Sequence, residues 1–185
     1  RRHWIKTSSE NKYIDYHNLS DHILIHPEED WEKYESIICK PIKVNNVKKI
    51  KILKRGLKSF IKNPSIIYNI NKQNLLLHFD MHHGYGNLEK AISVLSEEDR
   101  DDFSNYVNSK TQFNPHIMYI SKNFTLNRWF NSLFPWLQRC EKIFGHNLKG
   151  YDTGRLYAYL AERYSSFWFK KYTKYKEHSW IFLDK

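Results

Sequence analysis

Hydrophobic residues recur at helical spacing through the last third of the chain. Between residues 124 and 144 they lie mostly three or four positions apart, which predicts one long helix. Its inward face is expected to carry Leu126, Trp129, Phe130, Leu133, Leu137, Cys140, Ile143 and Phe144. Pro135 should kink or split this helix, and Gly145 should end it. A second apolar stripe predicts a last helix over about 152–170.

Shorter elements precede these helices. Two short helices are predicted over 88–109, the second beginning at Ser96 because Asp99 follows it three residues later. A helical turn is expected over 28–34. Strands are predicted at 22–25, 37–42, 116–121 and 179–183. The chain has 185 residues, enough for one domain with a buried core, so we expect a helix-rich α/β fold with a few short strands over residues 1–185.

Residues 43–74 differ from the rest of the chain in charge. No acidic residue interrupts the basic residues of this segment, which include Lys43, Lys48, Lys49, Lys51, Lys54, Arg55, Lys58 and Lys62. Apolar residues among them keep helical spacing, which predicts a basic amphipathic helix over 47–61, weakened at Gly56. This helix could lie in an anionic membrane surface, bind nucleic acid, or pack normally beneath a solvated basic face. No nucleic-acid-binding module is recognisable, which disfavours the second interpretation.

The composition favours an anionic partner. The net charge is +10 and the pI about 9.4, which suits nucleic acid, a phosphate-bearing substrate or an anionic membrane. A hydrophobic content of 41% excludes a disordered chain. Cys39 and Cys140 form neither a disulfide framework nor a CxxC metal site, and reduced thiols fit a cytoplasmic protein. The sequence contains no P-loop, GxGxxG, Ser-His-Asp pattern or Asp-x-Asp motif.

A first group of candidate site residues consists of His78, Asp80, His82 and His83, followed by Gly84-Tyr85-Gly86. His83 or Asp80 could act as a general base or orient a sugar hydroxyl, and the glycines would let a ligand approach the backbone. Local His-Asp spacing is weakly specific for a divalent metal, and a polar turn capped by histidines explains the same pattern.

A second group consists of Arg155, Glu162 and Arg163 on the last predicted helix. Arg155 and Glu162 are seven residues apart, so they share a helix face. An arginine there could hold a diphosphate, and Glu162 could be a catalytic carboxylate; the alternative is an internal salt bridge. Arg1 and Arg2 are either solvated or placed to stabilise charge on a phosphate leaving group.

The order and spacing of these motifs resemble the C-terminal half of a glycosyltransferase family of bacterial capsule, exopolysaccharide and O-antigen gene clusters, long catalogued as a domain of unknown function. Residues 1–4 are similar to the end of its His-Tyr-Arg-Arg motif, and residues 37–41 to its strand with a following Lys-Pro. The segment 117–121 resembles its Asn-Met-Phe-Ile-Met strand. Further matches are His83, Asn87-Leu88, Arg155, Leu160, Glu162 and Arg163, with departures at His78, Ile117 and Ala158.

The resemblance implies the C-terminal part of a GT-A-like fold, with residues 43–74 as a basic insertion. A nucleotide-binding half would precede Arg1, so the chain is expected to be inactive alone. The implied reaction moves a sugar from a nucleotide-sugar donor to a lipid-linked glycan at the cytoplasmic membrane face, with the protein as a peripheral partner of that surface. The cofactor is left open, with Mn or Mg as the candidate, and no residue is assigned as a metal ligand.

This interpretation assigns a role to each candidate residue. The expected catalytic residues are Asp80, His83 and Glu162. The expected substrate-binding residues are Arg1, Arg2, His82, Arg155 and Arg163. The rival hypothesis is a non-catalytic basic module that binds nucleic acid or an anionic membrane.

Overall fold

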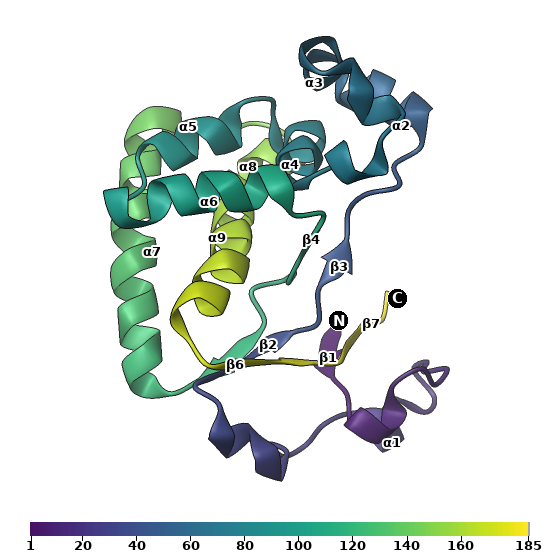
Figure 1. The fold of residues 1–185 in the computed structure, drawn as a ribbon. Helices are drawn as coiled ribbons and strands as arrows, with labels where there is room; N and C mark the ends of the chain where they lie inside the picture. The colour runs from purple at the N-terminus through teal and green to yellow at the C-terminus, as the bar shows by residue number, and fades with distance from the viewer. Residues whose placement is uncertain (185) are drawn as a thin grey trace.

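The computed structural model describes residues 1–184, the side chains of residues 151 and 152 left aside, as a mixed α/β fold rich in helix (Figure 1). The longest helices, α6, α7 and α9, pack together, with α9 against the other two. The helices after residue 74 are α4 (Leu75–His83), α5 (Asn87–Ser93), α6 (Glu97–Ser109), α7 (Asn123–Phe144), α8 (Tyr151–Gly154) and α9 (Leu156–Tyr172). Among the described residues, no helix has both the length and the hydropathy needed to cross a bilayer.

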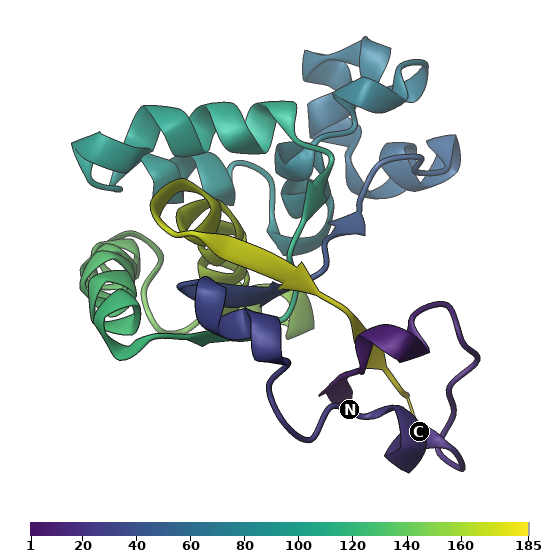
Figure 2. The ribbon, with the colours of Figure 1, turned by 60° about the horizontal axis from the view of Figure 1, so that its bottom comes forward.

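Within residues 1–184 the strands form three small sheets. β2 (Ser36–Cys39) lies between β5 (Tyr119–Ser121), to which it is antiparallel, and β6 (Tyr175–His178), to which it is parallel. β1 (Arg2–Trp4) pairs with β7 (Trp180–Phe182), and β3 (Ile42–Lys43) with β4 (Gln112–Phe113), both antiparallel. The two ends of the described chain therefore lie side by side (Figures 1 and 2).

The remaining elements are short and lie in the first half of the chain. α1 (Leu19–His22) is a single turn, and α2 (Lys49–Arg55) is followed directly by α3 (Leu57–Lys62). The 3-10 turns are Thr7–Ser9, Glu29–Lys33, Pro64–Ile67 and Ile70–Lys72.

The core is centred on α9, which is apolar on most of its circumference and is covered on several sides. Its Tyr164 ring lies 4.9 Å from Trp136 of α7 and 5.4 Å from Phe103 of α6, centroid to centroid. Trp168 of α9 contacts Trp129 of α7 at 5.3 Å. Aromatic pairs in tilted geometry add to the free energy gained from burial alone.

A buried carboxylate ties α6 to α9. Asp99 is 3% exposed and accepts hydrogen bonds from the Tyr164 hydroxyl at 2.6 Å and the Tyr172 hydroxyl at 2.7 Å. The Lys171 ammonium lies 2.9 Å from the same carboxylate. With three donors, the charge of Asp99 is satisfied in the interior, as a buried carboxylate requires.

Most of the predicted elements are confirmed. The helices over 88–109 and 124–144 and the helical turn over 28–34 are present, β5 and β7 lie within predicted strands, and β2 overlaps the strand predicted at 37–42. The helix expected over 47–61 is interrupted at its weak point, Gly56. The fold class, helix-rich α/β with a few short strands, is confirmed.

Several details differ from the prediction. The strand expected at 22–25 is reduced to a single antiparallel β-bridge between Ile23 and Ile5, because His22 is the last residue of α1. Pro135 does not split α7. Proline has no amide proton for the carbonyl one turn earlier, but Pro135 lies on the exposed side of the helix, where water can donate a hydrogen bond to that carbonyl. The last helix is broken at Arg155, directly after Gly154.

The predicted inward face of α7 differs from the observed one at Thr125, Trp136 and Ile143. Thr125 lies outside the predicted face, yet it is fully buried. Trp136 also lies outside the predicted face, yet it is fully buried, and its indole NH donates to the carbonyl of Ala91 at 2.7 Å. Ile143 belongs to the predicted face, yet it is 43% exposed.

Candidate functional site

An open cavity of about 450 Å³ lies among α4, the β3–β4 pair, the turn before β5 and the start of α9. Its walls come from segments far apart in the chain, because β1 reaches it from the N-terminal end and α9 from the C-terminal end. Six of the eight residues predicted for the site line it, namely Arg2, His82, His83, Arg155, Glu162 and Arg163. The sequence pattern therefore identified residues that the fold does bring together.

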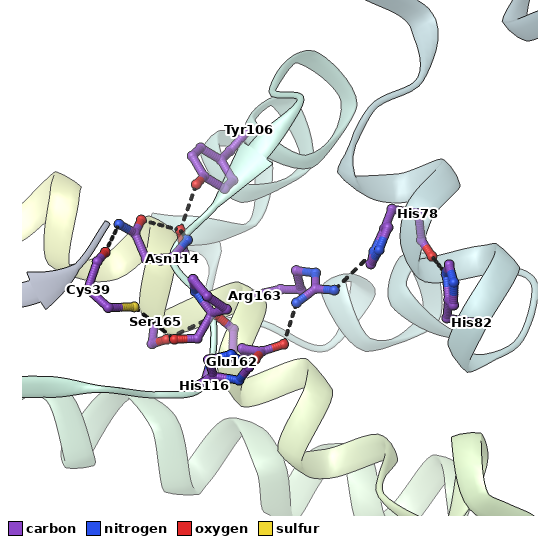
Figure 3. Close-up of polar contacts among 11 residues, drawn as sticks. Cys39, His78, His82, Tyr106, Asn114, His116, Glu162, Arg163 and Ser165 are labelled. Carbon is purple, nitrogen blue, oxygen red and sulfur yellow. Dashed lines mark hydrogen bonds and ion pairs between the residues drawn. The ribbon is translucent and has the colours of Figure 1, made fainter. Parts of the chain in front are cut away.

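Arg163 lies buried at the floor of this cavity, with 1% of its side chain exposed. Figure 3 shows its guanidinium between two groups: it donates to Glu162 Oε2 at 2.5 Å and to His78 Nδ1 at 3.1 Å. It also lies over the ring of Phe113, 3.5 Å from the centroid. Burial lowers the pKa of Arg163 and the Glu162 carboxylate opposes that shift, so the side chain stays charged.

Glu162 links this arginine to a strained turn. Its Oε1 accepts the backbone N–H of His116 at 2.5 Å (Figure 3). His116 and the following residue, Ile117, have φ angles of 70° and 52°, a left-handed conformation that costs about 1–3 kcal/mol for a residue other than glycine. Because both oxygens of Glu162 are engaged, its geometry fits the bracing alternative, and its catalytic role stays a prediction.

The histidines of α4 are ordered by helix geometry. His78 and His82 are one turn apart, and their rings stack at 4.6 Å. The ring Nδ1 of His82 lies 2.9 Å from the carbonyl of His78, and since a carbonyl only accepts, Nδ1 carries the proton. His83, 6% exposed, stacks on Tyr159 of α9 at 3.7 Å.

The environment of the cavity lowers the pKa of two of its histidines, His78 and His116. Burial, followed by the charge of Arg163, lowers the pKa of His78 to about 2. Burial and the nearby Arg2 likewise lower the pKa of His116. His78 can therefore serve as an acceptor for Arg163 throughout the physiological pH range.

Two predicted residues lie elsewhere. Asp80 is on the other side of α4, where it accepts the amide of Gly86 and the hydroxyl of Ser59, each at 3.0 Å. It lines a separate cavity of about 320 Å³, and burial raises its pKa. Arg1 is exposed and does not line the 450 Å³ cavity; its amino group donates to the Leu183 carbonyl.

The structure also adds residues to the predicted group. His78 lay in the histidine cluster but had no assigned role, and its spacing from His82 gains meaning only once α4 is known to be a helix. His116 carried no signal in the sequence, because a strained turn places it. Tyr159 stood on the predicted stripe of the last helix, where a core role was expected.

The donor set of the cavity suits an anion and does not fit Mn or Mg. Among the described lining residues three are arginines, four are histidines and one, Glu162, carries a carboxylate. Mn and Mg prefer several oxygen ligands, whereas this carboxylate already bridges Arg163 and His116. Within the described part of the chain, no three His, Cys, Asp or Glu side chains are grouped to hold a metal.

Comparison of the chain with family models, with curated proteins and with solved structures found no match.

Proposed function

We propose that the chain forms the diphosphate-binding and acceptor side of a GT-A-like, nucleotide-sugar-dependent glycosyltransferase. The reaction assembles capsular, exopolysaccharide or O-antigen glycan on a lipid-linked acceptor at the cytoplasmic membrane face. The observation that carries the proposal is the lining of the 450 Å³ cavity: three arginines and four histidines surround it, and its one described carboxylate is paired. The resemblance of the last helix and of residues 1–4 to the transferase family supports the same reaction.

The arginines divide into two roles. Arg2 and Arg155 are exposed residues at the cavity wall, so their guanidinium groups can reach a ligand and bind a diphosphate through paired hydrogen bonds. Arg163 is engaged by Glu162 and His78 and positions the floor instead. Charge that develops on the leaving diphosphate is stabilised by Arg2 and Arg155, which lowers the barrier to transfer.

The proton of the acceptor hydroxyl needs a base within the same cavity. Of the predicted catalytic residues, His83 lies in the cavity, Glu162 has both oxygens engaged, and Asp80 is outside it. In the proposed step the acceptor oxygen bonds to the anomeric carbon as the bond from that carbon to the diphosphate oxygen breaks. The proton passes to His83, and the electron pair leaves with the nucleoside diphosphate.

A donor screen on a full-length protein that contains this chain tests the proposal, with release of nucleoside diphosphate as the readout. The Arg155→Gln and Arg2→Gln variants should each lower kcat/KM by about 10–100-fold, the value of a charge-assisted hydrogen bond in the transition state. Arg1→Gln is the matched control, because Arg1 is exposed outside the cavity. No release from any nucleotide sugar, or equal losses in all three variants, would overturn the proposal.

A further inference from the structure

The helices α2 and α3, residues 49–62, form a pair with two apolar faces. On the inner face, Ile52 is fully buried and packs with Leu77 and Met81 of α4. The outer face carries a second apolar row at helical spacing. This row consists of Ile50, Leu53, Leu57 and Ile61, whose exposed fractions are 62%, 43%, 51% and 69%. We call residues 49–62 the basic helix pair.

The charge of this surface has one sign. No acidic residue occurs between Glu35 and Asp80, and the basic side chains of the helix pair are exposed. Lys62 reaches Glu89 of α5 at 3.5 Å. The surface is completed by Lys49, Lys51, Lys54, Arg55 and Lys58. In Figures 1 and 2 the helix pair lies at one corner of the molecule, where it can meet a large surface.

We propose that the basic helix pair docks the protein on an anionic lipid bilayer. The outer apolar row inserts at the boundary between headgroups and acyl chains, and the lysines contact lipid phosphates. A nucleic acid would use the lysines but would leave four large apolar side chains in water. A bilayer satisfies both the charge and the apolar row.

The position of the helix pair connects this surface with the cavity. α4 contacts the helix pair through Leu77 and Met81 and the cavity through His78 and His82. The hydrogen bond from Ser59 of α3 to Asp80 fixes the pair to the same helix. Docking would therefore hold the cavity beside the bilayer that carries the acceptor, and this consequence alone rests on the proposed function.

Vesicle sedimentation tests the docking without donor or acceptor, so its failure leaves the proposed diphosphate site untouched. The protein should bind vesicles of phosphatidylcholine with phosphatidylglycerol, bind weakly to phosphatidylcholine alone, and lose affinity as salt is raised. Equal binding to both vesicles, or binding to neither, would overturn the proposal.

Matched variants separate the two contributions. Lys54→Gln with Lys58→Gln should weaken binding about 25-fold, at roughly fivefold for each charge near the surface. Leu57→Gln with Ile61→Gln should weaken it about tenfold or more, because buried apolar area is lost. The controls are Lys142→Gln and Phe134→Gln, which change exposed residues of α7. A loss in the controls equal to that in the helix pair would count against docking there.

A probe of insertion decides between a bilayer and other occupants. The thiols of Cys39 and Cys140 are buried and burial raises the pKa of each to about 12, so a Leu57→Cys variant can be labelled selectively with an environment-sensitive fluorophore. Its emission should shift to the blue on anionic vesicles and stay unchanged with duplex DNA. An unchanged emission on vesicles, lysine-dependent DNA binding without vesicle binding, or burial of the probe by self-association would overturn the proposal.

Discussion

At the scale of single residues, the buried guanidinium of Arg163 is the costliest group of the site. An ionised side chain in the interior is tolerated only when it is paired and hydrogen-bonded. Glu162 supplies the opposite charge, His78 supplies an acceptor, and the Phe113 ring covers one face of the guanidinium. Its Nε has no hydrogen-bond partner among the described residues, so the site depends strongly on the contacts that it does have.

Neutralising the partner of this arginine should destabilise the fold. The Glu162→Gln variant keeps an acceptor for the His116 amide but leaves the charge of Arg163 uncompensated, so the free energy of unfolding should fall by about 3 kcal/mol. Urea denaturation measures it. The control is Glu141→Gln, which changes an exposed carboxylate 3.9 Å from His146. Its free energy of unfolding should fall by about 0.5 kcal/mol or less. Parental stability of Glu162→Gln with lost transferase activity would instead mark Glu162 as catalytic.

The neutral His78 makes stability depend on pH. Its pKa is about 2 in the native protein and lies near 6.5 in the unfolded chain, so between these values the unfolded state binds one more proton. Stability should therefore fall as the pH drops below about 6.5, by up to ~1.4 kcal/mol per pH unit from this group. Urea titrations from pH 7.5 to pH 5 measure the slope.

The His78→Gln variant retains an acceptor for Arg163 but cannot take up a proton, so its stability should depend less steeply on pH. The exposed His26→Gln variant serves as the control and should keep the parental slope. Identical slopes in the parent and in His78→Gln would contradict the neutral state of His78.

At the scale of elements, the helices could be predicted because their signal is local. Three- and four-residue spacing identifies the buried side of a helix, and Gly56 and Gly145 mark an interruption and an end. The sequence also places most of the arginines and histidines of the cavity in two groups, because one group lies on α4 and the other on α9 and the residue before it. Asp80 was grouped with the histidines for the same reason, although its carboxylate faces the opposite side of α4.

Tertiary placement lay beyond these patterns. The turn at His116 is held in a left-handed conformation by Glu162, which lies on a distant helix. The sequence does not predict strand β6, because this segment is held in an extended conformation by its parallel pairing with β2. Such contacts are set by the whole fold and leave no periodic signature in a single sequence.

The end of α7 provides an element-scale test. Gly145 has φ 69° and ψ −175°, a region that is essentially restricted to glycine, and an added Cβ would meet nothing within 4 Å. Gly145→Ala should therefore cost about 1–3 kcal/mol through the backbone alone, measured by urea denaturation.

The contrasting position is Gly86, with φ 75° and ψ −2°, where asparagine is tolerated. Gly86→Asn should cost less than Gly145→Asn. The reverse order would show that side-chain contacts, and not backbone conformation, decide these positions.

At the scale of the whole molecule, the cavity depends on the pairing of β1 with β7. This pairing places Arg2 beside Phe182, with the guanidinium 5.5 Å from the ring centroid, and Trp180 packs edge-on against His116 at 4.7 Å. The aromatic core around α9 includes none of these residues. The sheet at this edge can therefore be disturbed while the helices stay folded.

The Ile181→Pro variant tests this dependence. Ile181 is opposite His3, two positions from Arg1 and Leu183, which exchange backbone hydrogen bonds. Hydrogen-bonded pairs alternate along an antiparallel ladder, so the Ile181 amide also donates across it. Proline would remove this donor. Affinity for a nucleoside diphosphate, measured by calorimetry, should fall about tenfold through the displacement of Arg2. Far-ultraviolet circular dichroism should keep its helical signal, and Ile181→Val should change neither. Loss of the helical signal would contradict the independence of the helices from this sheet.

The pairing of β1 with β7 and of β2 with β6 has a consequence for synthesis on the ribosome. The backbone partners Arg1 and Leu183 are 182 residues apart, and Glu35, whose amide donates to the carbonyl of Lys174, is 139 residues from it. β1 and β2 therefore leave the exit tunnel long before their partners are translated, while neighbouring helices such as α4, α5 and α6 can already associate. Until then, unpaired strand edges can recruit other nascent chains. We expect slow translation of the residues between β2 and β6, or a shortage of chaperones, to reduce the yield of folded protein through aggregation at the edges of β1 and β2.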